Sequence, residues 1–308
     1  KETLFRGAAY SSQLKYEPLN VPAGKMSLYN NSPDDFYNWV LNNMATGEEV
    51  TRDSFVSRRW FGDYLEENLK RAAESKHREV DFQIIQQAVS DLTKGGDGTY
   101  TLHLEEGKEL EADVVIFATG NEAPADVVSE SEKQLLGNRY VSNPWSPDAL
   151  AHLNKYGNVL IVGTGLTMVD YVVSLKKQNH TGKIYALSLN GLLPKQHAAT
   201  TGYTFTKDIA HENIHQVFEN LKYEIENAKQ NNIGWRSVLD ALRADTARLW
   251  QTLSEESKHV FMSEYRAQWE IHRHRMPKAS ADEIDQLIKE KQLEILTGRL
   301  SGVEKSAN

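Results

Sequence analysis

The sequence predicts an α/β protein, and two observations carry that prediction. Residues 158–162 form an apolar strand that enters a glycine-rich turn, and a helix and a second strand at 183–188 follow within about 30 residues, the length of a βαβ unit. Apolar and aromatic side chains then recur at helical spacing through residues 206–275. We therefore expect a parallel sheet followed by a helical subdomain.

Composition narrows the classes of function. The 308 residues carry a net charge of −8, which argues against a nucleic-acid binder because neutralising phosphates requires a basic surface. The same charge argues against binding to an anionic membrane, and no apolar run approaches the roughly 18 residues of a membrane helix. The absence of cysteine excludes disulfides, thiolate metal sites and a redox-active cysteine pair. With no secretory signal visible, we expect a cytoplasmic protein whose partner is a small molecule.

The first part of the chain combines loops with two helices. Pro22 and Gly24 interrupt any regular element at 19–24. Ser32 is placed to cap a helix that has Pro33 at its first position. The apolar stripe of a second helix runs from Trp60 to Leu69.

A β-meander is expected next. The segment 80–92 predicts a strand, a glycine-rich turn follows at 95–98, and the alternating residues of 100–104 predict a half-buried strand. After another turn, the apolar run 113–118 predicts a short buried strand that ends at Thr119 and Gly120. A small residue and a glycine at a strand end allow a ligand to approach the backbone, although a plain strand terminus is the commoner case.

The glycine-rich turn at 163–168 is the strongest chemical signal. A pyrophosphate needs free backbone N–H groups at a helix N-terminus, and Gly163 and Gly165 permit the tight turn and the close approach. The third glycine of such motifs is replaced by Met168. Because a strand precedes the turn and a helix follows it, we favour a nucleotide site over a merely structural turn.

The end of the second strand is expected to face the nucleotide's ribose. Ser188, Leu189 and Asn190 provide no carboxylate there, which biases the site toward NADP and away from NAD. Ser188 and Lys195 are the candidate partners of a 2′-phosphate. Solvated loop residues are an equally good interpretation.

Aromatic residues in the helical region are expected to be core. Trp235, Trp250 and Trp269 fall at helical spacing, so we predict that they pack inside the subdomain. The histidines of the HRHR run at 272–275 lie two residues apart and do not share a helix face, so no metal site is expected. His197 follows a parallel strand at the edge where ligands sit, and is either a nicotinamide-side residue or a satisfied loop histidine.

Several motifs together resemble one family. The chain is similar to bacterial FAD/NAD(P)-binding proteins of largely uncharacterised function, which resemble flavin-dependent N-hydroxylating and Baeyer–Villiger monooxygenases. The shared motifs occur in order and span nearly the whole chain: FRGAAY at 5–10, LNVPA at 19–23, RRWFGDYL at 58–65, ATGN at 118–121, VGTGLTMVD at 162–170, GLLP at 191–194 and HRHR at 272–275.

The resemblance implies nested Rossmann-like FAD/NAD(P)-binding domains with a β-meander and a helical subdomain. It implies a partial FAD-binding domain with the meander at 1–150, an NAD(P)-binding βαβ unit at 151–205, a helical subdomain at 206–290 within the NAD(P)-domain insertion, and a strand returning toward the FAD domain at 291–308. The residues implied to contact FAD are Asn20, Val21, Pro22, Thr119 and Gly120, and those implied to contact NADP or NAD are Gly163, Thr164, Gly165, Leu166 and Thr167. Ser188 joins the nucleotide residues from its place at the end of the second strand.

The chain departs from the family's pattern at two places. The residues between Lys1 and Ser32 contain no strand–glycine-turn–helix for the FAD pyrophosphate, and the chain ends soon after a strand-like run at 293–296. We therefore expect a fragment that holds FAD weakly. The expected function is an FAD-dependent oxidoreductase that uses NAD(P)H as hydride donor, and the alternative is a non-catalytic nucleotide-binding or sensor protein.

Overall fold

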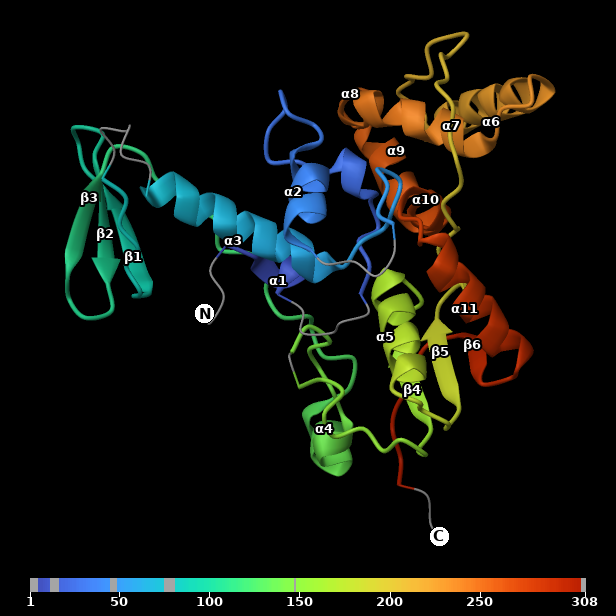
Figure 1. Ribbon diagram of the computed structural model, residues 1–308, viewed down its shortest axis with the longest axis horizontal. Helices are drawn as coiled ribbons and strands as arrows, with labels where there is room; N and C mark the ends of the chain where they lie inside the picture. Colours follow the sequence, from blue (N-terminus) through green and yellow to red (C-terminus); the bar gives the residue numbers. More distant parts are fainter. Residues whose placement is uncertain (1–4, 12–16, 45–48, 75–80, 147, 306–308) are drawn as a thin grey trace. The chain divides into compact units, whose positions relative to one another are not determined.

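The computed structural model describes residues 5–11, 17–44, 49–74, 81–146 and 148–305 (Figure 1). The chain divides into two compact units. The first, which we call the meander unit, comprises Lys1–Ser11 and Phe61–Ala123. The second, the main unit, comprises Ser12–Trp60 and Pro124–Asn308.

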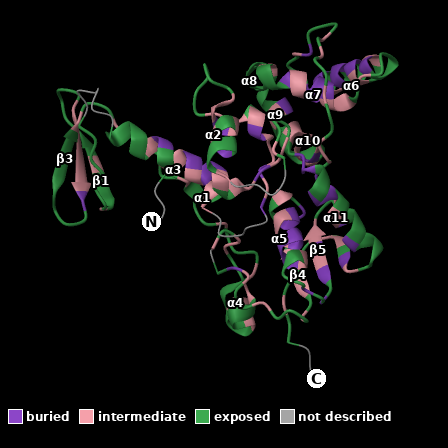
Figure 2. Cartoon of the chain, viewed as in Figure 1, coloured by how far each residue is buried: buried purple, intermediate pink, exposed green. Residues whose placement is uncertain are grey.

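The meander unit contains three antiparallel strands, of which the sequence predicts the first two. β1 (Val89–Lys94) pairs with β2 (Tyr100–Leu104), and β2 pairs with β3 (Glu109–Ala112). Most residues of β1 and β3 are exposed, whereas β2 is half-buried (Figure 2). The alternation at 100–104 thus predicted the middle strand, β2, and its partial burial.

The short helix α1 (Gly7–Tyr10) packs on the part of α3 (Arg58–Glu74) that belongs to the meander unit. The ring centroids of Tyr10 and Phe61 are 4.8 Å apart, and Arg6 Nη2 lies 2.7 Å from an Asp63 carboxylate oxygen. Phe61 and Tyr64 are buried on the predicted stripe of this helix. A side chain at Gly62 would collide with the Tyr10 carbonyl oxygen, so this packing depends on glycine.

The predicted buried strand at 113–118 is wrong. The structure has no strand there, and Val114, Ile116 and Phe117 are 75%, 83% and 73% exposed. None of the described strands hydrogen-bonds to this segment, so its apolar side chains have no sheet in which to be buried. Residues 81–88 likewise form no strand, and residue 80 lies outside the described residues.

The main unit is built on a parallel sheet of order β4-β5-β6. β4 (Val159–Val162) pairs with β5 (Ile184–Ser188), and β5 pairs with β6 (Leu293–Thr297). The predicted βαβ unit is therefore present. The expectation that residues 291–308 return to a separate FAD domain needs correction, because β6 hydrogen-bonds along the whole of β5 and completes the same sheet.

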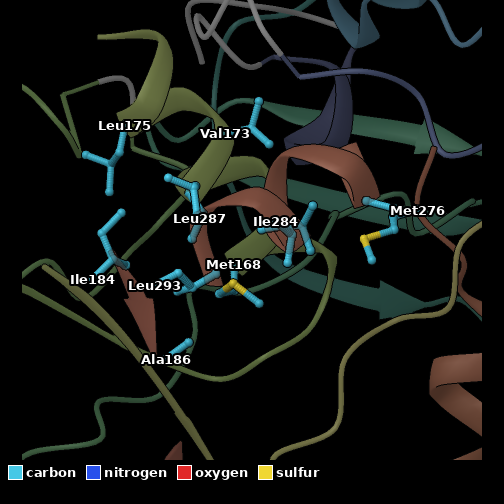
Figure 3. Close-up of a cluster of buried hydrophobic side chains, with 12 residues drawn as sticks. Met168, Val173, Leu175, Ile184, Ala186, Met276, Ile284, Leu287 and Leu293 are labelled. Carbon is cyan, nitrogen blue, oxygen red and sulfur yellow. The ribbon is translucent and has the colours of Figure 1, made fainter. Parts of the chain in front are cut away.

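Two helices cover this sheet. α5 (Leu166–Lys177) joins β4 to β5, and α11 (Lys278–Lys289) leads into β6. Their apolar faces share one core with β5 and β6, as Figure 3 shows for Met168, Ile184, Ile284 and Leu293. Each of these side chains is at most 2% exposed, so the core fixes the strand ends that form the site. α11 was expected within the helical subdomain, but its buried face belongs to this core.

The helices that lie between β5 and α11 in the chain form a second core. They are α6 (Ile214–Gln230), α7 (Trp235–Ala241), η3 (Leu242–Asp245), α8 (Thr246–Thr252), α9 (Glu255–Val260), the π-helical turn η4 (Phe261–Tyr265) and α10 (Arg266–Arg273). Trp235 and Trp269 pack partly buried against this core, but Trp250 is 42% exposed. The prediction for Trp250 is wrong because the neighbouring Leu249 takes the buried face of α8, and one residue turns the helix by about 100°.

The N-terminal part of the main unit is mostly irregular. η1 (Ala23–Lys25) and α2 (Asp35–Asn43) precede α3, and α2 begins after Asp34 and not at Ser32 as predicted. Backbone hydrogen bonds join Leu19 to Val56 and hold the loop at 19–24.

The second segment of the main unit begins with a short helix. α4 (Glu130–Leu136), capped by Ser129, is followed by η2 (Gly137–Arg139). Among the described residues, no helix combines the length and the apolar composition of a membrane span.

Candidate functional site

A cavity of about 620 Å³ opens at the carboxyl ends of the three parallel strands. This is the edge of a parallel sheet where ligands bind. The lining residues come from the turn after β4, the ends of β5 and β6, and one face of α10. They are Val127, Val162, Gly163, Thr164, Gly165, Leu187, Ser188, Leu189, Asn190, Leu192, Ala267, Glu270, Ile271, Gly298, Arg299 and Leu300.

The glycine turn forms one wall of this cavity. Gly163 has a φ of +111°, a backbone conformation that disfavours other residues, and its N–H donates to the Leu187 carbonyl at 2.7 Å. Gly165 is the N-cap of α5 and offers no side chain to cap the first turn. A Cβ on either glycine would meet no atom within 4 Å. The uncapped helix N-terminus therefore faces open space that an anion can enter.

Thr164 holds the turn in place. Its side chain is buried, and Oγ1 donates to the Leu192 carbonyl at 2.6 Å and lies 2.9 Å from Ser188 Oγ. The Gly191 N–H donates to the same Ser188 oxygen at 3.1 Å. Ser188 lines the cavity, as expected, but its hydroxyl is engaged in the turn. Its main role in the structure is to fix the loop after β5.

Leu166 and Thr167 begin α5 beyond the cavity wall. Leu166 packs against the core and Thr167 is exposed, and neither side chain lines the cavity. Their contribution to a bound anion would come from backbone N–H groups in the first turn of the helix.

The end of β6 adds a cation that the sequence analysis missed. Ser188 is opposite Thr297, the Gly298 N–H donates to the Ser188 carbonyl at 2.9 Å, and Arg299 lines the cavity next to this point. Lys195, the residue expected here, does not line the cavity; its backbone pairs with Ile271 and Met276. Recognising residues 293–297 as the third strand of the same sheet would have identified Arg299.

The loop expected near a flavin meets the loop that follows β5. His197 Nε2 lies 3.0 Å from the Asn20 carbonyl oxygen, and the rings of His197 and Phe55 are 4.9 Å apart. Burial, together with the positive charge of Arg275, lowers the pKa of His197. The imidazole is therefore neutral at pH 7, and Nε2–H donates to Asn20. Val21 and Pro22 are half-buried beside this contact.

Thr119 and Gly120 belong to the meander unit. Both residues are exposed, and Gly120 has a φ of +77°. The residues that the resemblance assigns to FAD are thus divided between the two units, and the nucleotide-side residues lie together in the main unit.

The HRHR run has structural partners. His272 Nδ1 donates a hydrogen bond to the Gln268 carbonyl at 2.7 Å, and His274 Nδ1 lies 2.5 Å from Glu270 Oε2. Arg275 is buried and forms an ion pair with Asp240. Within the described ranges, no group of three or more histidine, aspartate or glutamate residues is arranged to hold a metal ion.

Comparison with known proteins adds one family match. Residues 1–122 match the family described as FAD-NAD(P)-binding, which confirms the expected resemblance and its cofactor class. No curated protein matches the chain.

Two solved flavoprotein structures are similar to the chain. One is OTEMO in complex with FAD and NADP, at 14% identity and a TM-score of 0.39, covering 61% of this chain and 33% of that one. The other is the ornithine N-hydroxylase of Kutzneria sp. 744 with FADred, NADP+ and L-ornithine, at 15% identity and a TM-score of 0.43, covering 98% of this chain and 64% of that one. The chain thus spans about one third and just under two thirds of these two proteins.

Proposed function

We propose, on the premise that residues 1–122 match the FAD-NAD(P)-binding family, that the protein is an oxidoreductase in which NAD(P)H is the hydride donor and FAD the acceptor. The observation that carries the nucleotide half is the glycine turn at Gly163–Gly165, which opens into the cavity at the strand ends. A cytoplasmic location and a small-molecule substrate are part of the same proposal.

The geometry of the turn suits a pyrophosphate. Gly163 and Gly165 leave the approach to α5 free of side chains, and the first turn of the helix has no side-chain cap. Free N–H groups and the helix dipole both favour an anion at this position. The turn does not need a ligand to keep its shape, because Thr164 holds it through the Leu192 carbonyl.

The charges around the ribose position favour NADPH over NADH. The end of β5 carries Ser188, Leu189 and Asn190, with no carboxylate to bind a free 2′-hydroxyl. Arg299 supplies a cation in the same cavity. The one lining carboxylate among the described residues, Glu270, is already paired with His274.

The FAD half of the proposal rests on the family match. The sequence resemblance assigns Asn20, Val21 and Pro22 to the flavin's surroundings and Thr119 and Gly120 to a second flavin motif. When bound, FAD supplies a two-electron acceptor, and the protein supplies its position and electrostatics. A monooxygenase-like reaction with a small-molecule substrate is the finer form of this proposal, and a nucleotide-binding sensor without turnover is the alternative.

Gly165→Val tests the nucleotide site. The backbone of Gly165 is extended (φ −79°, ψ −169°), so valine fits there without strain and its side chain projects into the cavity. We expect NADPH binding, measured by titration calorimetry, to be lost while the circular dichroism spectrum and melting temperature are kept. The control is Gly202→Val, at an open loop position that does not line the cavity. Unchanged affinity in Gly165→Val would remove the assignment.

NADPH oxidation by the protein with added FAD separates enzyme from sensor. Oxidation above the rate of free FAD, abolished in Gly165→Val, supports an oxidoreductase. Tight NADPH binding without oxidation, at an FAD concentration at which the protein binds FAD, favours the sensor.

A further inference from the structure

Four arginines gather around Trp235 and Asp240, outside the nucleotide cavity. The guanidinium carbon of Arg236 lies 4.4 Å from the Trp235 ring centroid, and that of Arg275 lies 5.9 Å from it. Arg243 and Arg275 both pair with Asp240. Arg273 lies close enough to Arg243 and Arg275 to be repelled by them. We call Arg236, Arg243, Arg273 and Arg275 the arginine cluster; none of them lines the cavity at Gly163.

The arginine cluster carries more positive charge than its neighbours neutralise. Asp240 pairs with two of the four guanidinium groups, and Glu270 is a second carboxylate, whose charge attracts Arg273. Arg236 Nε donates to a neutral group, the Gln196 carbonyl, at 2.8 Å. Burial and then repulsion by neighbouring arginines lower the pKa of both Arg236 and Arg273. These groups stay charged at pH 7, so the repulsion persists in the folded protein.

Arg275 is the centre of this imbalance. Its side chain is 1% exposed, and Nη2 forms the ion pair with Asp240. Nε and Nη1 are buried, and no described residue accepts a hydrogen bond from either. A buried charged donor without an acceptor is costly, and an added anion removes that cost.

We propose that the arginine cluster is a second small-molecule site, one that binds an oxyanion group, either a carboxylate or a phosphate. Guanidinium groups bind such groups by charge-assisted hydrogen bonds, and Arg236 and Arg273 are half-buried, so both are partly open to solvent.

The place of the cluster suggests what the oxyanion belongs to. His197, whose pKa Arg275 and Arg243 help to lower, also contacts the Asn20 carbonyl. The oxyanion site therefore adjoins the loop assigned to the flavin, which favours a substrate that carries an acidic group. This substrate assignment rests on the proposed function, whereas the oxyanion site itself does not.

Titration calorimetry on the full chain tests the site with benzoate and with inorganic phosphate, in the absence of nucleotide. We expect saturable binding of at least one probe, weakened about tenfold or more in Arg236→Gln and in Arg273→Gln, because each removes a charge-assisted hydrogen-bond donor. Both side chains are half-buried, so these variants spare the buried Arg275. Arg248→Gln is the matched control, since Arg248 is an exposed arginine paired with Asp208 and Asp245.

Three results would overturn the proposal: no saturable binding of either probe, unchanged affinity in both cluster variants, or an equal loss in Arg248→Gln. A repeat with the protein saturated in 2′,5′-ADP distinguishes the two sources of the anion. Unchanged probe affinity supports a separate site, and competition assigns the cluster to the nucleotide's own phosphates and overturns it. If 2′,5′-ADP does not bind, the nucleotide proposal fails while the first titrations still decide the oxyanion site.

Discussion

His197 Nε2 lies 3.0 Å from the backbone carbonyl oxygen of Asn20, although the two residues are 177 positions apart in the chain. The contact joins the loop that follows β5 to the loop assigned to the flavin. The imidazole donates this hydrogen bond, while burial and the positive charge of Arg275 lower the pKa of His197. His197 is therefore a satisfied loop histidine whose side chain links the loop after β5 to the loop at 19–24.

His197→Gln is expected to change how stability depends on pH. The folded pKa of His197 lies below the ordinary 6.5, so the folded state resists protonation, and the free energy of unfolding falls as pH falls below 6.5. Glutamine can still donate to Asn20 but does not titrate, so urea denaturation between pH 5 and 8 should show a flatter acid side. His259→Gln, at an exposed helix position, serves as the control. An unchanged acid slope in His197→Gln would contradict the prediction.

Asp170→Asn tests a group whose contribution to stability changes with pH in the opposite direction, because it is lost as pH rises. Burial raises the pKa of Asp170 to about 7 from an ordinary 3.8, although Arg58 lies 3.3 Å away and opposes the shift. Because the folded state favours the neutral carboxyl, its contribution to stability is complete below pH 3.8 and is lost as pH rises toward 7. Asparagine keeps the neutral form, so the loss of stability between pH 4 and 7 should shrink.

The control for this measurement is Asp282→Asn, which replaces an exposed carboxylate paired with Lys278. Equal slopes for wild type and Asp170→Asn would show that Asp170 is ionised throughout the range, held by Arg58.

Local signals in the sequence predicted the strand, turn and helix around Gly163 and the first two strands of the meander. The strand, turn and helix around Gly163 are consecutive, so hydrophobic period and glycine spacing suffice to place them. The partner of β6 is a strand more than 100 residues earlier, with α6 to α10 inserted between them, and no local pattern reports that pairing. Arg299 was missed for this reason. The prediction of burial was wrong for Ile116 and Phe117, because an apolar run is buried only where a neighbouring strand covers it.

Glu224→Gln is expected to destabilise the helical part of the main unit. Glu224 is fully buried on α6 and accepts hydrogen bonds from Tyr203 Oη at 2.6 Å and from Thr206 Oγ1 at 2.6 Å and Thr206 N at 3.1 Å. Bonds to a charged acceptor contribute about 1.5–3 kcal/mol each, and an amide turns one acceptor into a donor facing donors. We expect a loss of about 2–4 kcal/mol in urea denaturation. Glu226→Gln, at an exposed position on the same helix, should stay within about 0.5 kcal/mol of wild type.

Arg299→Gln tests nucleotide discrimination. Arg299 follows β6 and lines the cavity beside Ser188, where the ribose of a dinucleotide is expected in a parallel sheet of this kind. A 2′-phosphate next to an arginine gains a charge-assisted hydrogen bond, which the 2′-hydroxyl of NADH does not share. We expect Arg299→Gln to weaken NADPH binding about tenfold or more and to leave NADH binding within about twofold.

Lys195→Gln is the matched variant, because the sequence pattern alone favoured Lys195 as the partner of the phosphate. Its side chain does not line the cavity, so its NADPH affinity should equal that of the wild type. The dissociation constants of NADPH and NADH are measured for each variant at one ionic strength. A general loss of surface charge would weaken NADPH binding in both variants, so a loss in one variant alone identifies the residue that contacts the phosphate. If Lys195→Gln loses NADPH affinity and Arg299→Gln does not, the third strand contributes nothing to specificity. If both nucleotides weaken equally in Arg299→Gln, the arginine contacts a part that they share.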